Sequence, residues 1–129
     1  MRKKPVKKAV PKKPKARHVG ELEIHMFCAK WLRDTHPQLL AFHVANERKA
    51  SVQYHVKLKR MGVLGGVADF LVFPNDGRKV AIELKDDKGA QDPEQIKFQK
   101  RWEHTGGVYY LVRTLLEFQT IISALMLFS

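Results

Sequence analysis

The chain has 129 residues, a length that fits one ordinary domain with its own hydrophobic core. Hydrophobic residues make up 44% of it, but no apolar run approaches the roughly 20 residues that a membrane-spanning helix needs. The formal net charge of +11 favours a polyanionic partner such as nucleic acid. Cys28 is the single cysteine, which excludes an intrachain disulfide and favours a reducing, cytoplasmic environment.

The positive charge is concentrated at the N-terminus. Residues 2–17 contain nine Lys or Arg and no acid, whereas the rest of the chain carries fifteen Lys or Arg against thirteen Asp or Glu. Lys pairs separated by Pro cannot bury enough apolar surface to fold alone, so residues 1–19 predict an extended, flexible arm. No apolar stretch follows these charges, which excludes a signal peptide. We expect the arm to bind phosphates without reading sequence; the alternative is a solubilising tail.

The first predicted element is a helix over residues 20–34, which ends before Pro37. Residues 39–44 predict a strand, and residues 45–65, which are polar, basic and interrupted by Gly, predict a loop. The inward side of the helix is expected to carry Ile24, Phe27, Cys28, Trp31 and Leu32. The loop carries the residues that we expect to contact DNA: Arg48, Lys49, Lys57, Lys59 and Arg60.

Two apolar runs, 66–73 and 79–85, predict strands joined by a hairpin turn at Asn75-Asp76-Gly77. The second half of the chain predicts a helix, a strand and a final helix. The helix begins at Asp92-Pro93 and ends near Thr105, and the strand covers 108–113. The last helix begins at the capping box Thr114–Glu117. Its apolar side carries Leu115, Phe118, Ile121, Ile122 and Leu125. The order α-β-β-β-α-β-α predicts an α/β fold with a mixed sheet flanked by helices.

Charged residues interrupt the two strands of this hairpin. Asp69 lies in the first strand, and Glu83 and Lys85 lie two residues apart at the end of the second. Side chains two apart on a strand share a face, and hairpin pairing would bring Asp69 to the same place. Two carboxylates and an ammonium suit a hard divalent cation and a phosphate, the equipment of a metal-dependent nuclease. The alternative is that Asp69 is an edge residue of the sheet in contact with water and that Glu83-Leu84-Lys85 matches the E-x-K pattern by chance.

Helical spacing selects further candidates. Glu21 aligns with the inward stripe of its helix, whereas Glu23 aligns with solvated positions, so Glu21 is the candidate acid. Gln95 shares a face with Phe98 and Trp102, where its amide could orient a water or a phosphate oxygen; an ordinary helical role is the alternative. The histidines show no spacing typical of zinc ligands, so none is predicted to bind metal: His18, His25, His36, His43, His55 and His104.

These motifs, taken in order, resemble the VRR-NUC domain, a branch of the PD-(D/E)XK nuclease superfamily. The resemblance covers about residues 20–118 of a domain that we place at 20–129, and the compact length is similar to the stand-alone members found in bacteriophages, which would place the protein in the host cytoplasm. It rests on Glu21…Ile24-His25, Asn46-Glu47-Arg48, Gly65-Gly66-Val67-Ala68-Asp69, Ile82-Glu83-Leu84-Lys85, Gly89, Asp92-Pro93-Glu94-Gln95 and Gly106-Gly107. Ala68 stands where the superfamily name has Pro, and His25 where a Gln is common.

The resemblance implies a restriction-endonuclease-like fold and a Mg²⁺ or Mn²⁺ site. Its ligands would be Glu21, Asp69, Glu83 and the backbone carbonyl of Leu84, with Lys85 as the catalytic lysine and Gln95 as a supporting residue. No small-molecule cofactor is implied. The implied activity is structure-selective DNA cleavage by a homodimer, foremost at four-way (Holliday) junctions. The alternatives are a flap, fork or non-specific nuclease of the same fold, or a basic nucleic-acid-binding module without catalysis.

Overall fold

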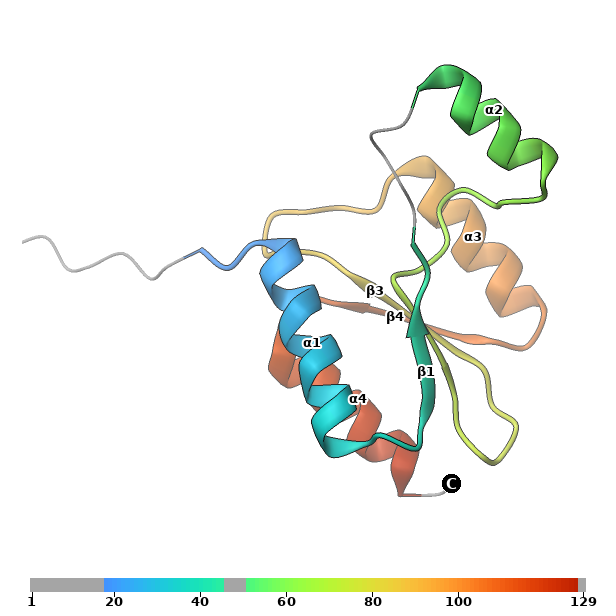
Figure 1. Cartoon of the computed structure of the whole chain (residues 1–129). Coiled ribbons are helices and arrows are strands. Elements are labelled where there is room, and N and C mark those ends of the chain that lie inside the picture. The colour runs from blue at the N-terminus through green and yellow to red at the C-terminus, as the bar shows by residue number, and fades with distance from the viewer. Residues whose placement is uncertain (1–17, 46–50, 128–129) are drawn as a thin grey trace, which may run out of the picture.

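A computed structural model describes residues 18–45 and 51–127 of the chain (Figure 1). Residues 1–17 of the predicted arm, the Asn46-Glu47-Arg48 motif, Lys49 and Phe128 lie outside the described residues. Along the described chain, no helix combines the length and apolarity needed to cross a membrane. The elements are α1 (Glu21–Thr35), β1 (Leu40–His43), α2 (Val52–Arg60), β2 (Phe70–Phe73), β3 (Val80–Leu84), α3 (Pro93–His104), β4 (Val108–Val112) and α4 (Leu115–Met126).

The four strands form one mixed sheet in the order β1-β2-β3-β4. β1 with β2 and β2 with β3 are antiparallel, whereas β3 with β4 is parallel, because α3 provides the crossover between them. The predicted hairpin is confirmed: Phe70 pairs with Ile82, and Gly77 in the turn has a φ of +87°. The predicted α/β class, with a mixed sheet flanked by helices, is therefore correct.

Helices cover both faces of this sheet (Figure 1). α1 and α4 pack on one face, where the larger core cluster includes Cys28, Ile82, Leu84 and Phe118. α3 packs on the other face, and its Phe98 meets a smaller cluster that includes Ala81 of β3. Because side chains alternate along a strand, Glu83 and Lys85 share the α3 side with Ala81, while Ile82 and Leu84 face α1 and α4.

The segment at residues 45–65 is not the loop that its composition predicts, because Val52–Arg60 form the helix α2. Ser51 caps this helix by accepting a hydrogen bond from the Tyr54 backbone N–H at 3.1 Å. None of the nine residues of α2 is buried, and its apolar residues Val52, Tyr54, Val56 and Leu58 alternate with polar ones, a pattern that does not indicate a helix. The Ser51 cap is the signal that would have identified it.

Phe27 is also not in the core, although the helical pattern places it inward. Its side chain is 49% exposed, whereas Ile24, Cys28 and Leu32 are buried. The buried row follows a strict four-residue spacing, so the contact surface of α1 is narrower than the pattern predicts. Cys28 is a core residue as expected, and burial raises the pKa of its thiol to about 12, which makes it a poor nucleophile.

Gly66 allows the loop before β2 to touch the first turn of α3. It has a φ of +75°, and a Cβ at this position would overlap the backbone carbonyl of Glu94. Only glycine meets both conditions without strain. This close approach sets the strand that carries Asp69 beside the helix that carries Gln95.

Candidate active site

The hairpin brings two of the predicted acids together. Asp69 lies just before β2, across from Glu83 of β3 in the antiparallel register that pairs Phe70 with Ile82. Its carboxylate oxygen Oδ2 accepts a hydrogen bond from the Leu84 backbone N–H at 2.8 Å. This bond orients the Asp69 carboxylate toward the end of β3, where Glu83 lies.

The third acid comes from a segment that is far from Asp69 and Glu83 in the sequence. Glu21 is the first residue of α1, and one carboxylate oxygen from each of Glu21, Asp69 and Glu83 lies within 4.8 Å of the other two. The structure thus brings together the three acids that the sequence selected. Glu23, which the helical count rejected, is not part of this group. We call these three residues the carboxylate site.

Glu83 is the buried member of the carboxylate site, with 1% of its side chain exposed. Its Oε1 accepts a hydrogen bond from the Gln95 side-chain amide at 2.9 Å, but its Oε2 has no hydrogen-bond partner among the described residues. Burial, followed by the charge of Asp69, raises the pKa of Glu83 to about 9, and the charge of Lys85 opposes this shift. An ionised Glu83 is therefore costly in this site unless a cation is bound.

Lys85 lies two residues beyond Glu83 and is 5% exposed, so an ammonium is buried beside the carboxylate site. Its backbone N–H donates to the Val112 carbonyl at 2.9 Å, which continues the β3–β4 pairing. The Leu84 carbonyl belongs to the same stretch of backbone; its predicted role as a metal ligand stays a prediction.

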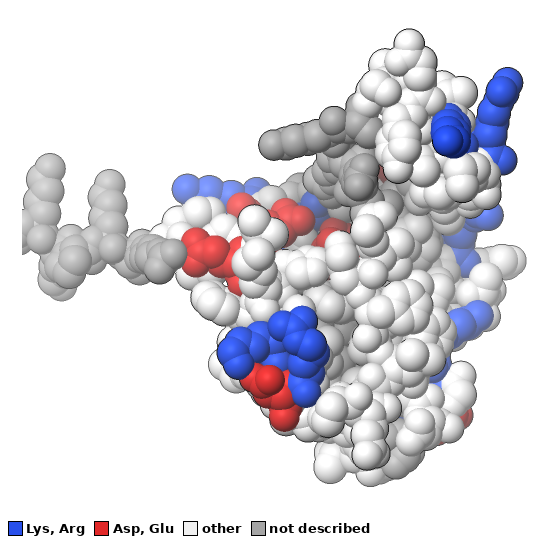
Figure 2. All heavy atoms as spheres, in the orientation of Figure 1, with Lys and Arg blue, Asp and Glu red and all other residues white. Residues whose placement is uncertain are grey.

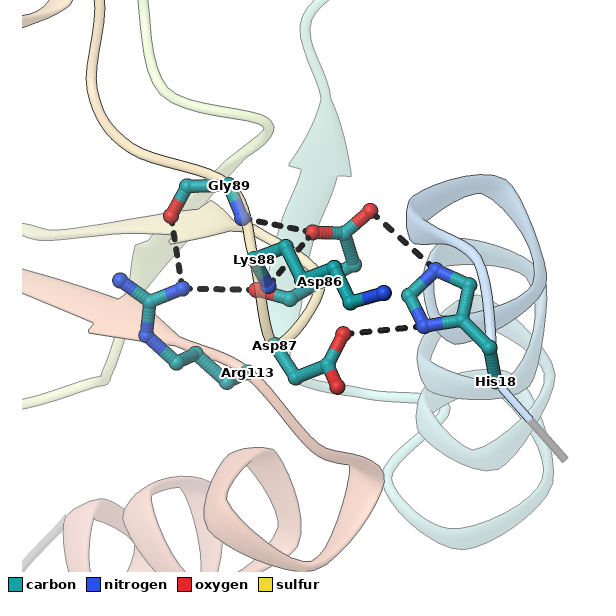
Figure 3. Close-up of polar contacts among 6 residues, drawn as sticks. All are labelled: His18, Asp86, Asp87, Lys88, Gly89 and Arg113. Atoms are coloured by element: carbon teal, nitrogen blue, oxygen red, sulfur yellow. Dashed lines mark hydrogen bonds and ion pairs between the residues drawn. The ribbon is translucent and has the colours of Figure 1, made fainter. Parts of the chain in front are cut away.

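The loop after Lys85 is held by polar contacts that sequence reasoning did not identify (Figure 3). The Asp86 carboxylate accepts from the Gly89 backbone N–H at 2.7 Å, and the Arg113 guanidinium donates to the carbonyls of Asp86 and Gly89, both at 2.7 Å. His18, just before α1, lies 2.9 Å from Asp87 and 3.5 Å from Asp86. The loop is thereby tied to the start of α1 and to the end of β4.

Gln95 links α3 to the carboxylate site. Its backbone N–H donates to the Asp92 carboxylate at 2.9 Å, and its side-chain oxygen accepts from the Asp92 backbone N–H at 3.0 Å, so both halves of a capping box are present. Its amide nitrogen is left to donate to Glu83. Gln95 therefore orients Glu83 from a fixed helix terminus, a contact that the helical spacing alone did not predict.

A cavity of about 870 Å³ is lined by the three acids of the carboxylate site and by Gln95. α2 forms one wall of it through His55, Leu58 and Lys59, so the helix missed by the sequence analysis helps to enclose the site. The other two predicted DNA contacts within the described residues, Lys57 and Arg60, are exposed on α2. Figure 2 shows basic side chains along the side of the molecule formed by α2 and α3.

Two histidines that the sequence analysis rejected as ligands also line this cavity, His25 from α1 and His43 from β1. Their ring centroids are 4.3 Å apart with an interplanar angle of 88°. The His43 Nδ1 lies 2.7 Å from the Asp69 backbone carbonyl oxygen. Burial, with a further contribution from His43, lowers the pKa of His25. No linear motif joins these residues, because they meet only when α1 packs on the sheet and β1 pairs with β2.

Comparison with known proteins gives structural matches alone, since no protein-family model and no curated protein matches the chain. One solved structure, described as "VRR_NUC domain protein", aligns with a TM-score of 0.65 at 18% identity and covers 83% of this chain and 88% of its own. A second, described as "VRR_NUC domain", aligns with a TM-score of 0.53 at 17% identity and covers 80% of this chain and 94% of its own. The chain therefore has the restriction-endonuclease-like fold of VRR_NUC domain proteins, as the sequence resemblance predicted.

Proposed function

We propose that this protein is a metal-dependent endonuclease of the VRR-NUC type that hydrolyses phosphodiester bonds in DNA. The observation that carries the proposal is the carboxylate site itself. Three acids from separate elements converge beside a buried lysine, at a cavity with Lys59 on its α2 wall. A module that only binds nucleic acid has no need of an inward acid cluster, which would repel phosphate.

The residues fit a hard divalent cation. The Oε2 of Glu83, without a hydrogen-bond partner among the described residues, offers a ligand atom, and a cation would offset the burial and the neighbouring acid that raise the pKa of this carboxyl. Oxygen ligands are the type that Mg²⁺ and Mn²⁺ prefer. Glu21, Asp69, Glu83 and the Leu84 carbonyl would hold the ion. When bound, it supplies a water of lowered pKa and stabilises charge on the phosphoryl oxygens.

The protein's own residues have distinct roles in this proposal. Hydrolysis adds water across one P–O ester bond, so negative charge grows on the phosphoryl oxygens. The Lys85 ammonium, on the same strand face as Glu83, stabilises that charge or positions the attacking water. Gln95 is a positioning residue, because it acts on the reaction through its hydrogen bond to Glu83.

The proposed substrate is branched DNA, with the four-way junction as the first choice. Resolution of a junction needs two symmetric cuts, which a two-fold homodimer supplies with two identical sites. The exposed apolar end of α4, where Leu127 is 77% exposed, is the proposed dimer surface. Lys57, Lys59 and Arg60 of each subunit, together with Arg48 and Lys49, would line the shared DNA face.

The test is cleavage of labelled junction, flap, fork and linear duplex DNA with Mg²⁺, Mn²⁺ or EDTA. Asp69→Asn keeps an acceptor for the Leu84 N–H, and Glu83→Gln keeps one for Gln95, so both variants should fold. Each should lose cleavage by at least about 100-fold, the scale expected when one group that stabilises transition-state charge is removed. DNA binding should survive, and without metal it should tighten.

Two further variants sharpen this test. Lys85→Met keeps the apolar stem but removes the charge, so it should lose turnover while the protein still binds Mn²⁺. Glu103→Gln changes an exposed acid on α3 outside the carboxylate site and should cleave as the wild type does. Near-normal cleavage by Asp69→Asn or Glu83→Gln would refute the assignment, and binding without cleavage by the wild type would indicate a non-catalytic module.

A further inference from the structure

His25 and His43 form a second group with Asp69, which does not include Glu83. Both histidines contact Phe70, whose side chain is in the core beneath α1, whereas Glu83 projects to the α3 side of the sheet. One ring nitrogen of each histidine and one Asp69 carboxylate oxygen all lie within 4.8 Å of one another. Asp69 is thus common to this group and to the carboxylate site.

The hydrogen bond of His43 determines which of its ring nitrogens can bind a metal ion. The Asp69 backbone carbonyl can only accept, so the His43 Nδ1 at 2.7 Å must carry the proton. In the neutral ring this leaves the lone pair on Nε2. A backbone carbonyl that accepts from the second ring nitrogen is the usual partner of a metal-binding histidine, because it fixes both the tautomer and the ring orientation.

The spacing is close to that of ligands around one ion. Metal–nitrogen and metal–oxygen bonds of about 2.1 Å place neighbouring ligand atoms roughly 3 Å apart and opposite ones roughly 4.2 Å apart. The upper limit of 4.8 Å is close to this range.

We propose that His25, His43 and Asp69 form a second metal site, which binds a first-row transition-metal ion such as Zn²⁺ in preference to Mg²⁺. Imidazole nitrogen suits zinc, copper, nickel and iron, whereas Mg²⁺ selects oxygen ligands. Two histidines and one carboxylate leave further coordination positions open toward the cavity. Because Asp69 serves both sites, ions at the two sites influence each other. This inference goes beyond the proposed nuclease function, since metal binding at the imidazoles requires no cleavage.

The experiment uses the untagged full chain and Co²⁺ as the probe. The variant Glu21→Gln/Glu83→Gln removes two ligands of the carboxylate site and leaves His25, His43 and Asp69 in place. It should bind one equivalent of Co²⁺, followed by visible absorption. Proton NMR should show paramagnetically shifted imidazole N–H signals that disappear in D₂O, with slow exchange for the Nδ1–H that His43 donates to Asp69.

Further substitutions in that variant identify the ligands. His25→Gln and His43→Gln should each weaken Co²⁺ binding by at least about tenfold, since even partners of ligands cost 10- to 100-fold. His55→Gln is the matched control, because His55 lines the same cavity but is not in the His25–His43–Asp69 group. It should bind Co²⁺ as the parent variant does. Circular dichroism of each variant reports whether it is folded.

Two outcomes would overturn the site: equal Co²⁺ affinity in the folded His25→Gln and His43→Gln variants, or Co²⁺ binding without shifted imidazole N–H signals. Neither outcome depends on nuclease activity. If the wild type fails to cleave DNA but the imidazole signals appear, the proposed function fails and this site stands. If cleavage with Mg²⁺ proceeds and the imidazole signals are absent, the His25–His43–Asp69 site fails and the proposed function stands.

Discussion

The Glu83 carboxyl differs from the other carboxyls of the site because it is almost completely buried and only one of its two oxygens has a hydrogen-bond partner among the described residues. Gln95 donates to Oε1, whereas Oε2 has no partner among the described residues. Burial and the nearby charge of Asp69 raise its pKa to about 9. At neutral pH without metal the folded protein therefore keeps a proton on Glu83 that the unfolded chain releases.

This pKa shift predicts a pH-dependent stability in EDTA. Between the ordinary glutamate pKa of about 4.5 and the folded value of about 9, the folded state binds more protons than the unfolded state. The free energy of unfolding should therefore decrease as pH rises through this window, by at most about 1.4 kcal/mol per pH unit. Glu83→Gln should flatten the dependence in urea unfolding at pH 5 to 9. Glu103→Gln should keep the wild-type slope, and an equal slope in all three proteins would contradict the shift.

At the scale of elements, the candidate site depends on contacts between segments that are separate in sequence. The loop before β2 touches α3 at Gly66, α3 reaches β3 through Gln95, and α2 encloses the cavity. None of the nine residues of α2 is buried, so this helix contributes little to the core. Its exposed basic residues are the proposed DNA contacts.

Gly66→Ala should destabilise the protein more than Gly62→Ala does. Both glycines have positive φ, +75° and +94°, so each substitution costs about 1 kcal/mol from backbone strain. At Gly62 nothing lies within 4 Å of the added Cβ, whereas at Gly66 the Cβ overlaps the Glu94 carbonyl and adds about 1–3 kcal/mol. Urea unfolding of the two variants isolates this contact. Equal destabilisation would show that the loop and α3 are not in close contact.

The basic residues of α2 predict a salt-dependent contribution to DNA binding. Lys57→Gln, Lys59→Gln and Arg60→Gln should each weaken binding, and each lost phosphate contact should flatten the slope of log K against log salt by roughly 0.9. Lys30→Gln removes the same charge from α1, where Lys30 pairs with Asp34, and serves as the control. Anisotropy titrations at several salt concentrations measure the slopes. If the α2 variants and the control behave alike, α2 does not contact DNA.

For the whole molecule, the proposed junction cleavage requires two sites related by symmetry. Leu116 and Leu127 lie eleven residues apart on α4 and its C-cap, so they share a helix face, and they are 71% and 77% exposed. This face extends toward the chain end, where the sequence remains apolar. A homodimer through this surface would bury apolar area that the core of one subunit does not use.

The dimer prediction is tested by light scattering at micromolar concentration, which should report about twice the monomer mass. Leu116→Lys/Leu127→Lys should shift the protein to the monomer and abolish paired cleavage of a junction, because charge at an apolar interface is costly. Met26→Lys changes an apolar residue of α1 that is 61% exposed and should leave the dimer intact. A monomer that makes paired symmetric nicks would refute the link between dimer and resolution.

Local patterns in the sequence determined most of the fold. The strands that carry Asp69 and Glu83, the turn at Gly77 and the caps at Asp92 and Thr114 all depend on residues close to one another in the chain, so spacing identified them. The convergence of Asp69 with Glu83 was predictable for the same reason, because a hairpin is a local structure. α2 escaped detection, since its apolar residues alternate with polar ones from Val52 to Leu58, which is not the spacing of an amphipathic helix.

Long-range contacts were decided only by the tertiary structure. The 4.8 Å grouping of Glu21 with Asp69 and Glu83 requires α1 to pack against the sheet, and the grouping of His25 and His43 with Asp69 requires this packing and also the pairing of β1 with β2. The sequence by itself determined which acids, which lysine and which strands the site contains. Three features arise from packing between distant segments, which no local spacing encodes. They are the Oε2 of Glu83 without a partner among the described residues, the hydrogen bond from Gln95 to Oε1 of Glu83, and the imidazoles beside Asp69.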